Sequence, residues 1–300
     1  MFVEKRKRGT AVKFYLVYSY REGEVKKIRK YLGTNLSPGE LQTARQQAEL
    51  LIKKEIQDIE IFNFSLTKKQ IERLSKYEQR IQHLQHLDWK KFTEQFTYNT
   101  NAIEGSTVQL SEVENILEKK KGENEEEIET IGVAKAVEFI RTTKEELSLN
   151  LIKKLHLHCF QGSKSFSGRF RKVEVVIRNG RGDIVHQGIP VARLNQALNE
   201  FISWYHQNKN NFKPLVLAAI IHNQFENIHP FQDGNGRVGR LLLNFILIKN
   251  KYPPINISLE DRAGYYQTLQ EYSKNDNLKL TLVFLIKQYQ KTLKQVATKK

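Results

Sequence analysis

Cysteine is almost missing from this 300-residue chain, and long apolar runs are missing altogether. The single cysteine, Cys159, lies in an apolar helical pattern without a second cysteine to pair with. This excludes a disulfide framework within the chain and favours a reducing compartment, the cytoplasm. No apolar run approaches bilayer length, so we expect no membrane partner. The basic N-terminus has no following apolar segment and is not typical of a secretory signal.

Acidic residues are few relative to basic ones: 33 Asp and Glu stand against 49 Lys and Arg, a formal charge of +16. Such a charge attracts nucleic acid, anionic membrane, nucleotides or acidic proteins without selecting one of them. A solvated lysine-rich surface has the same composition. The hydrophobic content of 39% is that of a globular protein rather than a disordered one.

The first 35 residues predict a small β module. Apolar and polar residues alternate on both sides of residues 21–24, which is the signature of a β-hairpin with a short turn. Ten basic and three acidic residues fall within residues 1–30. This pattern loosely resembles the basic strand modules found ahead of integrase and transposase domains. Nucleic-acid binding, or docking of a basic surface hairpin on the main domain or a partner, both remain open.

Residues 36–130 predict a helical region. Ser37 supplies an N-cap, Pro38 an early proline and Glu40 a capping-box partner. The charged run at residues 119–130 predicts an exposed connection.

From residue 131 onward, helical patterns dominate again. Residues 241–248 are apolar on nearly every side, as in a buried central helix. One interruption, residues 170–190, alternates and turns at residues 179–182, which predicts a β-hairpin. The fold class is therefore mainly α, with one inserted hairpin and another at the N-terminus.

The segment at residues 228–240, IHPFQDGNGRVGR, carries the chemistry. A Gly-Asn-Gly turn leads into a long helix, and glycines let the backbone approach an anion closely. The free N–H groups of a helix N-terminus attract the same anion. Arg237 and Arg240 are three residues apart, so both can reach a phosphate chain lying across the helix end.

Two further residues of this segment complete a reaction centre. Asp233 is placed to hold a hard cation such as Mg²⁺ that bridges phosphate oxygens. His229, fixed by the stiff Pro230, has a side chain suited to accepting a proton near neutral pH. An anion cradle, a cation ligand and a general base within twelve residues indicate a phosphoryl-type transfer centre.

The same string matches the signature HPFx(D/E)GNGRxxR at every defined position, and the chain resembles the Fic family. Similar segments lie at residues 147–156, 167–171 and 219–226. The resemblance covers about residues 147–290 and implies a Fic-type helical bundle, with a Fic catalytic domain at residues 131–292.

The resemblance implies transfer of AMP from ATP, with Mg²⁺, to a hydroxyl of a target protein. His229 would deprotonate that hydroxyl, Asp233 would bind Mg²⁺, and Arg240 would hold the γ-phosphate. The other phosphate-binding positions implied are Gly234, Asn235, Gly236 and Arg237. The acidic residue at position 233 favours AMP transfer over the kinase branch of the family.

The hairpin at residues 172–187 would be the family's flap, on which an extended target segment adds as a strand. The flap residues implied to touch the nucleotide are Val175, Val176 and Ile177. Tyr265 and Tyr266 match a tyrosine pair near the adenine, although the bare sequence equally allows core aromatics. Ser273 stands where the family often has Asn, which leaves UTP or another donor open.

A built-in inhibitor is implied at residues 100–105. Thr100, Glu104 and Gly105 fit the family pattern (S/T)xxxE(G/N). Glu104 would pair with Arg240 and take the place of the γ-phosphate. Control of this segment by a homodimer is a further hypothesis.

Alternative functions remain open at this point. The same site can remove AMP from a modified protein, or transfer another nucleotide. From a different class, the chain can be a nucleic-acid-binding regulator that uses its basic N-terminal module.

Overall fold

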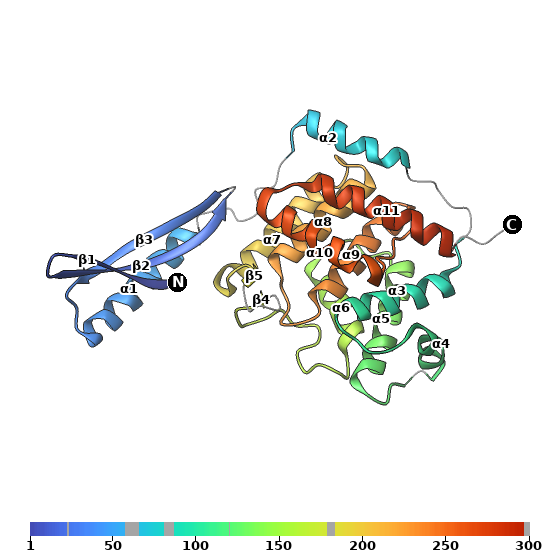
Figure 1. Ribbon diagram of the computed structural model, residues 1–300, viewed down its shortest axis with the longest axis horizontal. Helices are drawn as coiled ribbons and strands as arrows, with labels where there is room; N and C mark the ends of the chain where they lie inside the picture. The colour runs from blue at the N-terminus through green and yellow to red at the C-terminus, as the bar shows by residue number, and fades with distance from the viewer. Residues whose placement is uncertain (23, 58–65, 81–86, 120, 179–183, 297–300) are drawn as a thin grey trace.

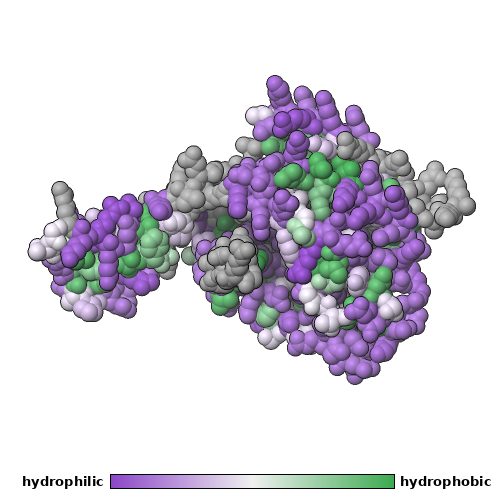
Figure 2. Space-filling model, in the orientation of Figure 1, coloured by the Kyte–Doolittle hydropathy of each residue, from purple (hydrophilic) through white to green (hydrophobic). Residues whose placement is uncertain are grey.

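The computed structural model describes residues 1–22, 24–57, 66–80, 87–119, 121–178 and 184–296 (Figure 1). Within these ranges eleven α-helices dominate, beside one antiparallel sheet of three strands and one of two. The predicted mainly α fold is therefore confirmed. None of the helices described is long and apolar enough to cross a membrane. The surface in Figure 2 is mostly hydrophilic.

The N-terminal sheet has the order β1 (Phe2–Arg8), β2 (Ala11–Glu22) and β3 (Glu24–Thr34). Strands β2 and β3 form the predicted hairpin, whose turn residue Gly23 lies outside the described residues. The prediction of a hairpin alone was incomplete, because β1 pairs with β2 as a third strand. Charged residues fill most of β1, so its sequence lacks the apolar alternation that marks a strand, as is common at sheet edges.

Helix α1, Pro38–Gln57, packs against one face of this sheet. Its predicted capping box is present: Ser37 N donates to Glu40 Oε2 at 2.9 Å, and Glu40 N donates to Ser37 Oγ at 3.4 Å. A small apolar core joins helix and strands through Leu16, Tyr18, Ile28, Ala48 and Ile52. The N-terminal unit therefore runs through α1 instead of ending at residue 35, because the apolar sheet face needs a cover.

The helical body consists of α2 Lys68–Ser75, α3 Trp89–Ile103, α4 Leu110–Lys119, α5 Glu125–Thr142, α6 Leu149–Phe160, α7 Val191–Asn208, α8 Pro214–Ile228, α9 Asn235–Lys249, α10 Arg262–Asn275 and α11 Leu278–Val296, with 3-10 helices at Lys76–Arg80 and Leu259–Asp261. Helix α9 contacts α3, α5, α6 and α8. Residues 241–247 are all buried. The predicted central helix is thus confirmed, and α9 positions the site at its N-terminus.

Residues 119–130, predicted as an exposed connection, include the first turns of α5. Asn124 caps this helix, since its Oδ1 accepts a hydrogen bond from Glu127 N at 2.9 Å. The side chain of Glu129, one turn further on, is buried. The boundary predicted at residue 130 therefore falls inside a helix that shares one core with α3 and α9.

The inserted hairpin is present as strands β4 (Val176–Arg178) and β5 (Ile184–Gln187), which pair antiparallel. Its predicted turn at residues 179–182 lies outside the described residues. Val176 and Ile177 are exposed on β4. The hairpin lies beside the loop between α8 and α9, because Ile189 N donates to Ile228 O at 3.2 Å.

Candidate active site

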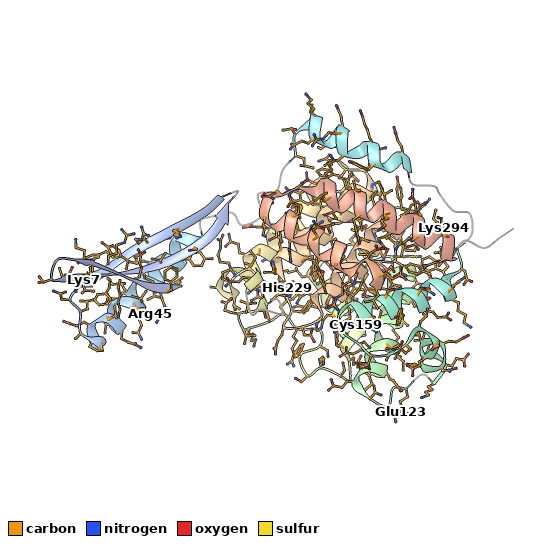
Figure 3. The ribbon with its side chains drawn as sticks, in the orientation of Figure 1. Lys7, Arg45, Glu123, Cys159, His229 and Lys294 are labelled. Atoms are coloured by element: carbon orange, nitrogen blue, oxygen red, sulfur yellow. The ribbon has the colours of Figure 1, made fainter. Side chains whose placement is uncertain are left out.

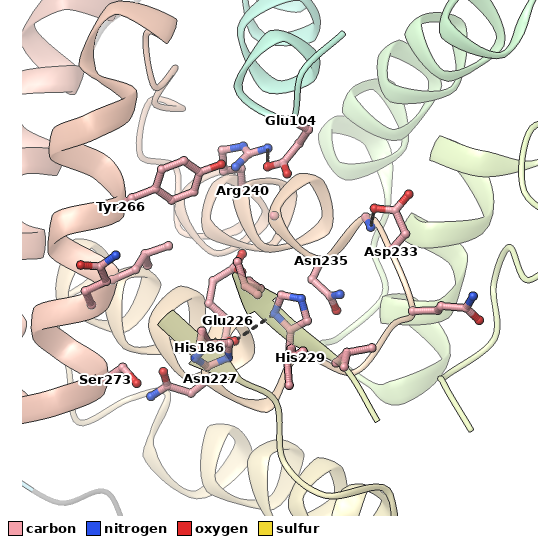
Figure 4. Close-up of a pocket in the computed structure, with 18 of the residues that line it drawn as sticks. Glu104, His186, Glu226, Asn227, His229, Asp233, Asn235, Arg240, Tyr266 and Ser273 are labelled. Carbon is pink, nitrogen blue, oxygen red and sulfur yellow. Dashed lines mark hydrogen bonds and ion pairs between the residues drawn. The ribbon is translucent and has the colours of Figure 1, made fainter. Parts of the chain in front are cut away.

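A cavity of about 840 Å³ opens between the α8–α9 loop, the hairpin, α10 and the end of α3 (Figure 4). This volume is within the range of small-molecule sites. The predicted site residues that line it are Glu104, Val175, Val176, Ile177, His229, Asp233, Gly234, Asn235, Gly236, Arg240, Tyr265 and Tyr266. Arg237, Thr100 and Gly105 are not among the lining residues.

His229 follows α8 directly in the left-handed conformation, with φ 52° and ψ 61°. Its Nδ1 lies 3.3 Å from Glu226 O. That contact requires a proton on Nδ1 and leaves Nε2 as the acceptor nitrogen. Burial lowers the pKa of His229 to about 4, and repulsion from His186 adds to this. The imidazole is therefore neutral near pH 7 and able to accept a proton.

Arg171 ties the hairpin to this loop, a role that sequence analysis missed. Its side chain is 0% exposed. Its guanidinium donates to the carbonyl oxygens of His229 (2.7 Å), Val173 (3.0 Å), Ile228 (3.4 Å) and Ile189. Two of these carbonyls lie at the end of α8, where helix carbonyls lack partners within the helix. Arg171 thus fixes the backbone that carries His229.

We expect Arg171→Met to reduce the free energy of unfolding by about 3 kcal/mol or more, because each buried carbonyl left unpaired costs about 1–3 kcal/mol. Arg171→Lys keeps the charge and part of the hydrogen-bond donors, so it should lose less stability than Arg171→Met. Urea denaturation of the three proteins measures the difference. A Met variant as stable as wild type would refute this role.

The loop between α8 and α9 is held by side chains from inside the protein. Asn235 Oδ1 accepts from Phe231 N at 2.8 Å, and Asn235 Nδ2 donates to Phe231 O at 2.9 Å. His156 accepts from Gly168 N at 2.9 Å and donates through Nε2 to Asp233 O, 3.1 Å away. The side-chain amide of Asn235 is therefore already bonded to the backbone of Phe231. An anion in the site would bind instead to the backbone N–H groups at the start of α9.

Arg240 lies at the base of the cavity, paired with Glu104. Arg240 Nη2 donates to Glu104 Oε1 at 2.7 Å and to Thr100 O at 3.0 Å, while Nε donates to Thr100 Oγ1 at 2.7 Å. Burial acts to lower the pKa of Arg240, but Glu104, Tyr265 and Glu226 together outweigh burial and raise it. Thr100 thus holds the guanidinium that Glu104 neutralises.

The Glu104 carboxylate also lies against the start of α9. A Cβ atom on Gly236 would collide with Glu104 Oε1, so this position accommodates the carboxylate only as glycine. Gly105, with φ 101°, turns the chain after Glu104, which ends α3. A negative group is therefore already present where the helix N-terminus and Arg240 converge (Figure 4).

Arg237 points elsewhere. Its guanidinium pairs with the buried Glu129 of α5 and lies 4.3 Å from the centroid of the Phe160 ring. It reaches Asp233 only at 4.0 Å. The predicted role of Arg237 in phosphate binding stays a prediction, since its strongest partner here is Glu129. Sequence analysis missed Glu129 because the acidic run around it resembles a solvated surface.

Tyr265 and Tyr266 lie side by side, with ring centroids 5.4 Å apart. Tyr265 is buried; its OH lies 3.0 Å from His222 Nε2 and 3.4 Å from Arg240 Nη1. Tyr266 donates to Ile103 O at 3.4 Å. The tyrosines line the cavity and also position Arg240 and the end of α3, whereas the place of an adenine beside them stays a prediction.

Glu226 is a buried carboxyl group in the cavity wall that sequence analysis also missed. It is 8% exposed, and its Oε1 has no hydrogen-bond partner within the described residues. Burial raises its pKa from 4.5 to about 8; Arg240 opposes this and Glu104 adds to it. The folded protein therefore keeps Glu226 largely protonated near pH 7.

We expect Glu226→Gln to be more stable than wild type at high pH. From pH 4.5 to about 8 the unfolded chain releases the Glu226 proton while the folded protein retains it, so wild-type stability falls as pH rises. The amide does not titrate, so the variants should match near pH 4 and differ by on the order of a few kcal/mol near pH 8. Denaturation at several pH values measures this, and parallel curves would contradict it.

Asp233 stands at the mouth of the cavity with its side chain 53% exposed. Its Oδ1 accepts from Gly234 N at 2.6 Å. No group of three or more His, Cys, Asp or Glu side chains that could hold a metal occurs in the described part of the chain. The predicted role of Asp233 as a Mg²⁺ ligand stays a prediction; a cation there would take its other ligands from phosphate and water.

Comparison with known proteins shows similarity to the Fic/DOC family. The model of the Fic/DOC family matches residues 146–247. Protein adenylyltransferase Fic of Nematostella vectensis is 30% identical over 192 residues, which cover 61% of this chain and 44% of that protein. The Aedes aegypti protein of the same name is 31% identical over 196 residues, 61% of this chain and 37% of its own. The chain thus spans less than half the length of these relatives.

Solved structures agree on the fold. A Fic domain-containing signaling protein from Bacteroides thetaiotaomicron superposes with a TM-score of 0.63 at 23% identity, over 75% of this chain and 94% of that chain. Fic-1 from C. elegans superposes with a TM-score of 0.63 at 24% identity, over 87% of this chain and 77% of that chain. The predicted Fic-type bundle is confirmed. Residues 146–247 thus match the Fic/DOC family model, and the chain has the fold of the solved Fic domains.

Proposed function

We propose that this protein transfers AMP from ATP to a hydroxyl side chain of another protein and releases pyrophosphate. One observation carries the proposal: a single cavity brings a neutral His229 imidazole, the free N–H groups of α9 and the Arg240 guanidinium together. Relatives that share the domain are named protein adenylyltransferase Fic, which supports the same reaction.

In the proposed reaction, the target hydroxyl oxygen attacks the α-phosphorus of ATP. His229 Nε2 takes the hydroxyl proton as the new P–O bond forms, and the bond to the β-phosphate breaks to release pyrophosphate. The N–H groups of Asn235 and Gly236 lie at the start of α9, where they can bind phosphate oxygens. Arg240 would hold the terminal phosphate once Glu104 leaves it.

Asp233 is the residue that would hold Mg²⁺, since its exposed carboxylate lines the same cavity. A bound Mg²⁺ supplies positive charge that offsets the charge of the phosphates. The orientation of the carboxylate is set by the loop itself, through the bond from Gly234 N.

The flap is the proposed place of the target protein. Strand β4 exposes Val176 and Ile177 and belongs to a sheet of only two strands. An extended target segment can add to such a strand through main-chain hydrogen bonds, which would bring a hydroxyl next to His229. Across the cavity, Ser273 of α10 lines the wall where a base would lie, so the choice of donor base is part of the test.

The test uses ATP labelled at either the α- or the γ-phosphate, with Mg²⁺ and a lysate as the source of target. We expect protein to become labelled from the α position and not from the γ position. Unlabelled ATP should reduce this labelling more than GTP, UTP or CTP. Label from the γ position would indicate a kinase instead. Stronger competition by UTP would leave nucleotide transfer in place and change the donor.

A further inference from the structure

The sheet of the N-terminal unit has a second face, on the side away from α1, which contributes no residue to the catalytic cavity. Helix α1 covers the sheet face that carries Leu16 and Ile28. Successive side chains of a strand point to opposite faces, so on each strand the residues directly before and after an α1-facing residue point away from α1. We call that side the open face; its charged and aromatic members used below are Glu4, Arg6, Lys13, Tyr15, Lys27, Arg29 and Tyr31, and Phe2, Val17 and Ser19 lie on the same side. Figure 3 labels Lys7 on the sheet and Arg45 on α1 of this unit.

Contacts between the strands verify this assignment. Tyr15 pairs in register with Tyr31, and their ring centroids are 5.4 Å apart. The Arg6 guanidinium lies 5.6 Å from the Tyr15 ring centroid. Glu4 bonds Arg6 at 2.7 Å and Arg29 at 3.0 Å. These residues therefore form one continuous surface of cations and aromatic rings.

The open face is strongly basic. Its four cations, Arg6, Lys13, Lys27 and Arg29, stand against one carboxylate, Glu4, which leaves three positive charges. Arg6, Lys27 and Arg29 are exposed. Glu4 pairs with both guanidinium groups, which come from the two outer strands, β1 and β3. Basic groups with aromatic rings between them suit a polyanion that also offers flat bases or sugars.

The dimensions favour one polyanion. The major groove of B-form DNA is about 12 Å wide and admits a two-stranded β-ribbon, so two neighbouring strands of this sheet, about 4.8 Å apart, can enter it. The major groove of A-form RNA is too narrow and deep for side chains to enter. We infer that the open face binds double-stranded DNA, with its cations against the phosphates.

The experiment uses the full chain and a labelled DNA duplex of about 20 base pairs, with anisotropy measured between about 50 and 200 mM salt. One variant changes Arg6, Lys13, Lys27 and Arg29 to Gln. The matched control changes four exposed lysines of the helical body to Gln: Lys68, Lys69, Lys274 and Lys279. Circular dichroism checks that both variants are folded.

Wild type and the control are expected to bind DNA with a steep salt dependence. The open-face variant should bind at least about tenfold more weakly. The magnitude of its slope of log affinity against log salt should fall by about 2–4, because each phosphate contact contributes about one to that slope. Absence of wild-type binding at low salt would overturn the inference. So would equal losses in both variants, equally tight binding to an RNA duplex, or binding to anionic vesicles alone. None of these outcomes depends on AMP transfer.

Discussion

Replacing Glu104 with glycine is expected to raise AMP transfer by about ten- to a hundredfold. Glu104 pairs with Arg240 and lies against Gly236 at the start of α9. These are the groups that the triphosphate needs. A charge-assisted hydrogen bond is worth about 1.5–3 kcal/mol, and each 1.4 kcal/mol corresponds to a factor of about ten in occupancy. The rate of label incorporation from α-labelled ATP into lysate protein measures the effect.

Glu104→Gln serves as the graded control, because it removes the charge and keeps the size. We expect it to fall between wild type and Glu104→Gly. A folded Glu104→Gly protein that transfers no more AMP than wild type, with its target present, would disprove the inhibitory role. If that variant instead loses the ability to remove AMP from a modified protein, then AMP removal is the direction that Glu104 supports.

Changing His229 to alanine in the Glu104→Gly background should lower transfer by about 10²–10⁴-fold, the usual contribution of a general base. ATP binding should persist, because the start of α9 and Arg240 are unchanged. His206→Ala, on the exposed side of α7, is the matched control and should transfer normally. A transfer rate that survives loss of His229 would remove it from the reaction.

The pH profile of the same reaction depends on His229. Since burial lowers its pKa to about 4, kcat/KM should fall on the acid side near pH 4 rather than near the ordinary histidine value of about 6.5. Initial rates of the Glu104→Gly protein between about pH 4 and 8 measure this. An acid limb centred near pH 6.5 would show that His229 is more exposed than the structure has it.

The parts of the site that could be predicted from sequence are those that a short segment makes by itself. Residues 228–240 contain the loop, the helix start and the histidine, so their spacing alone places them together. The pairing of Glu104 with Arg240 joins residues 136 apart, and only the family resemblance suggested it. Local pattern carries no information about such a distance.

The residues that could not be predicted act across similar separations. Arg171 bonds carbonyls 57 and 58 residues away, and Glu129 pairs with Arg237 across 108 residues. A buried ion pair looks in sequence like two surface charges. Strand β1 was missed for a related reason: it gains its place from pairing with β2, whereas its own residues are mostly charged.

The most direct test of this account compares the affinities of ATP and AMP for wild type and Glu104→Gly by calorimetry with Mg²⁺. If Glu104 occupies the place of the terminal phosphate at Arg240, the Kd for ATP falls by about tenfold or more in the variant. The Kd for AMP, which lacks that phosphate, then changes by less than about twofold. Equal changes for both nucleotides, or no change for ATP, would contradict it.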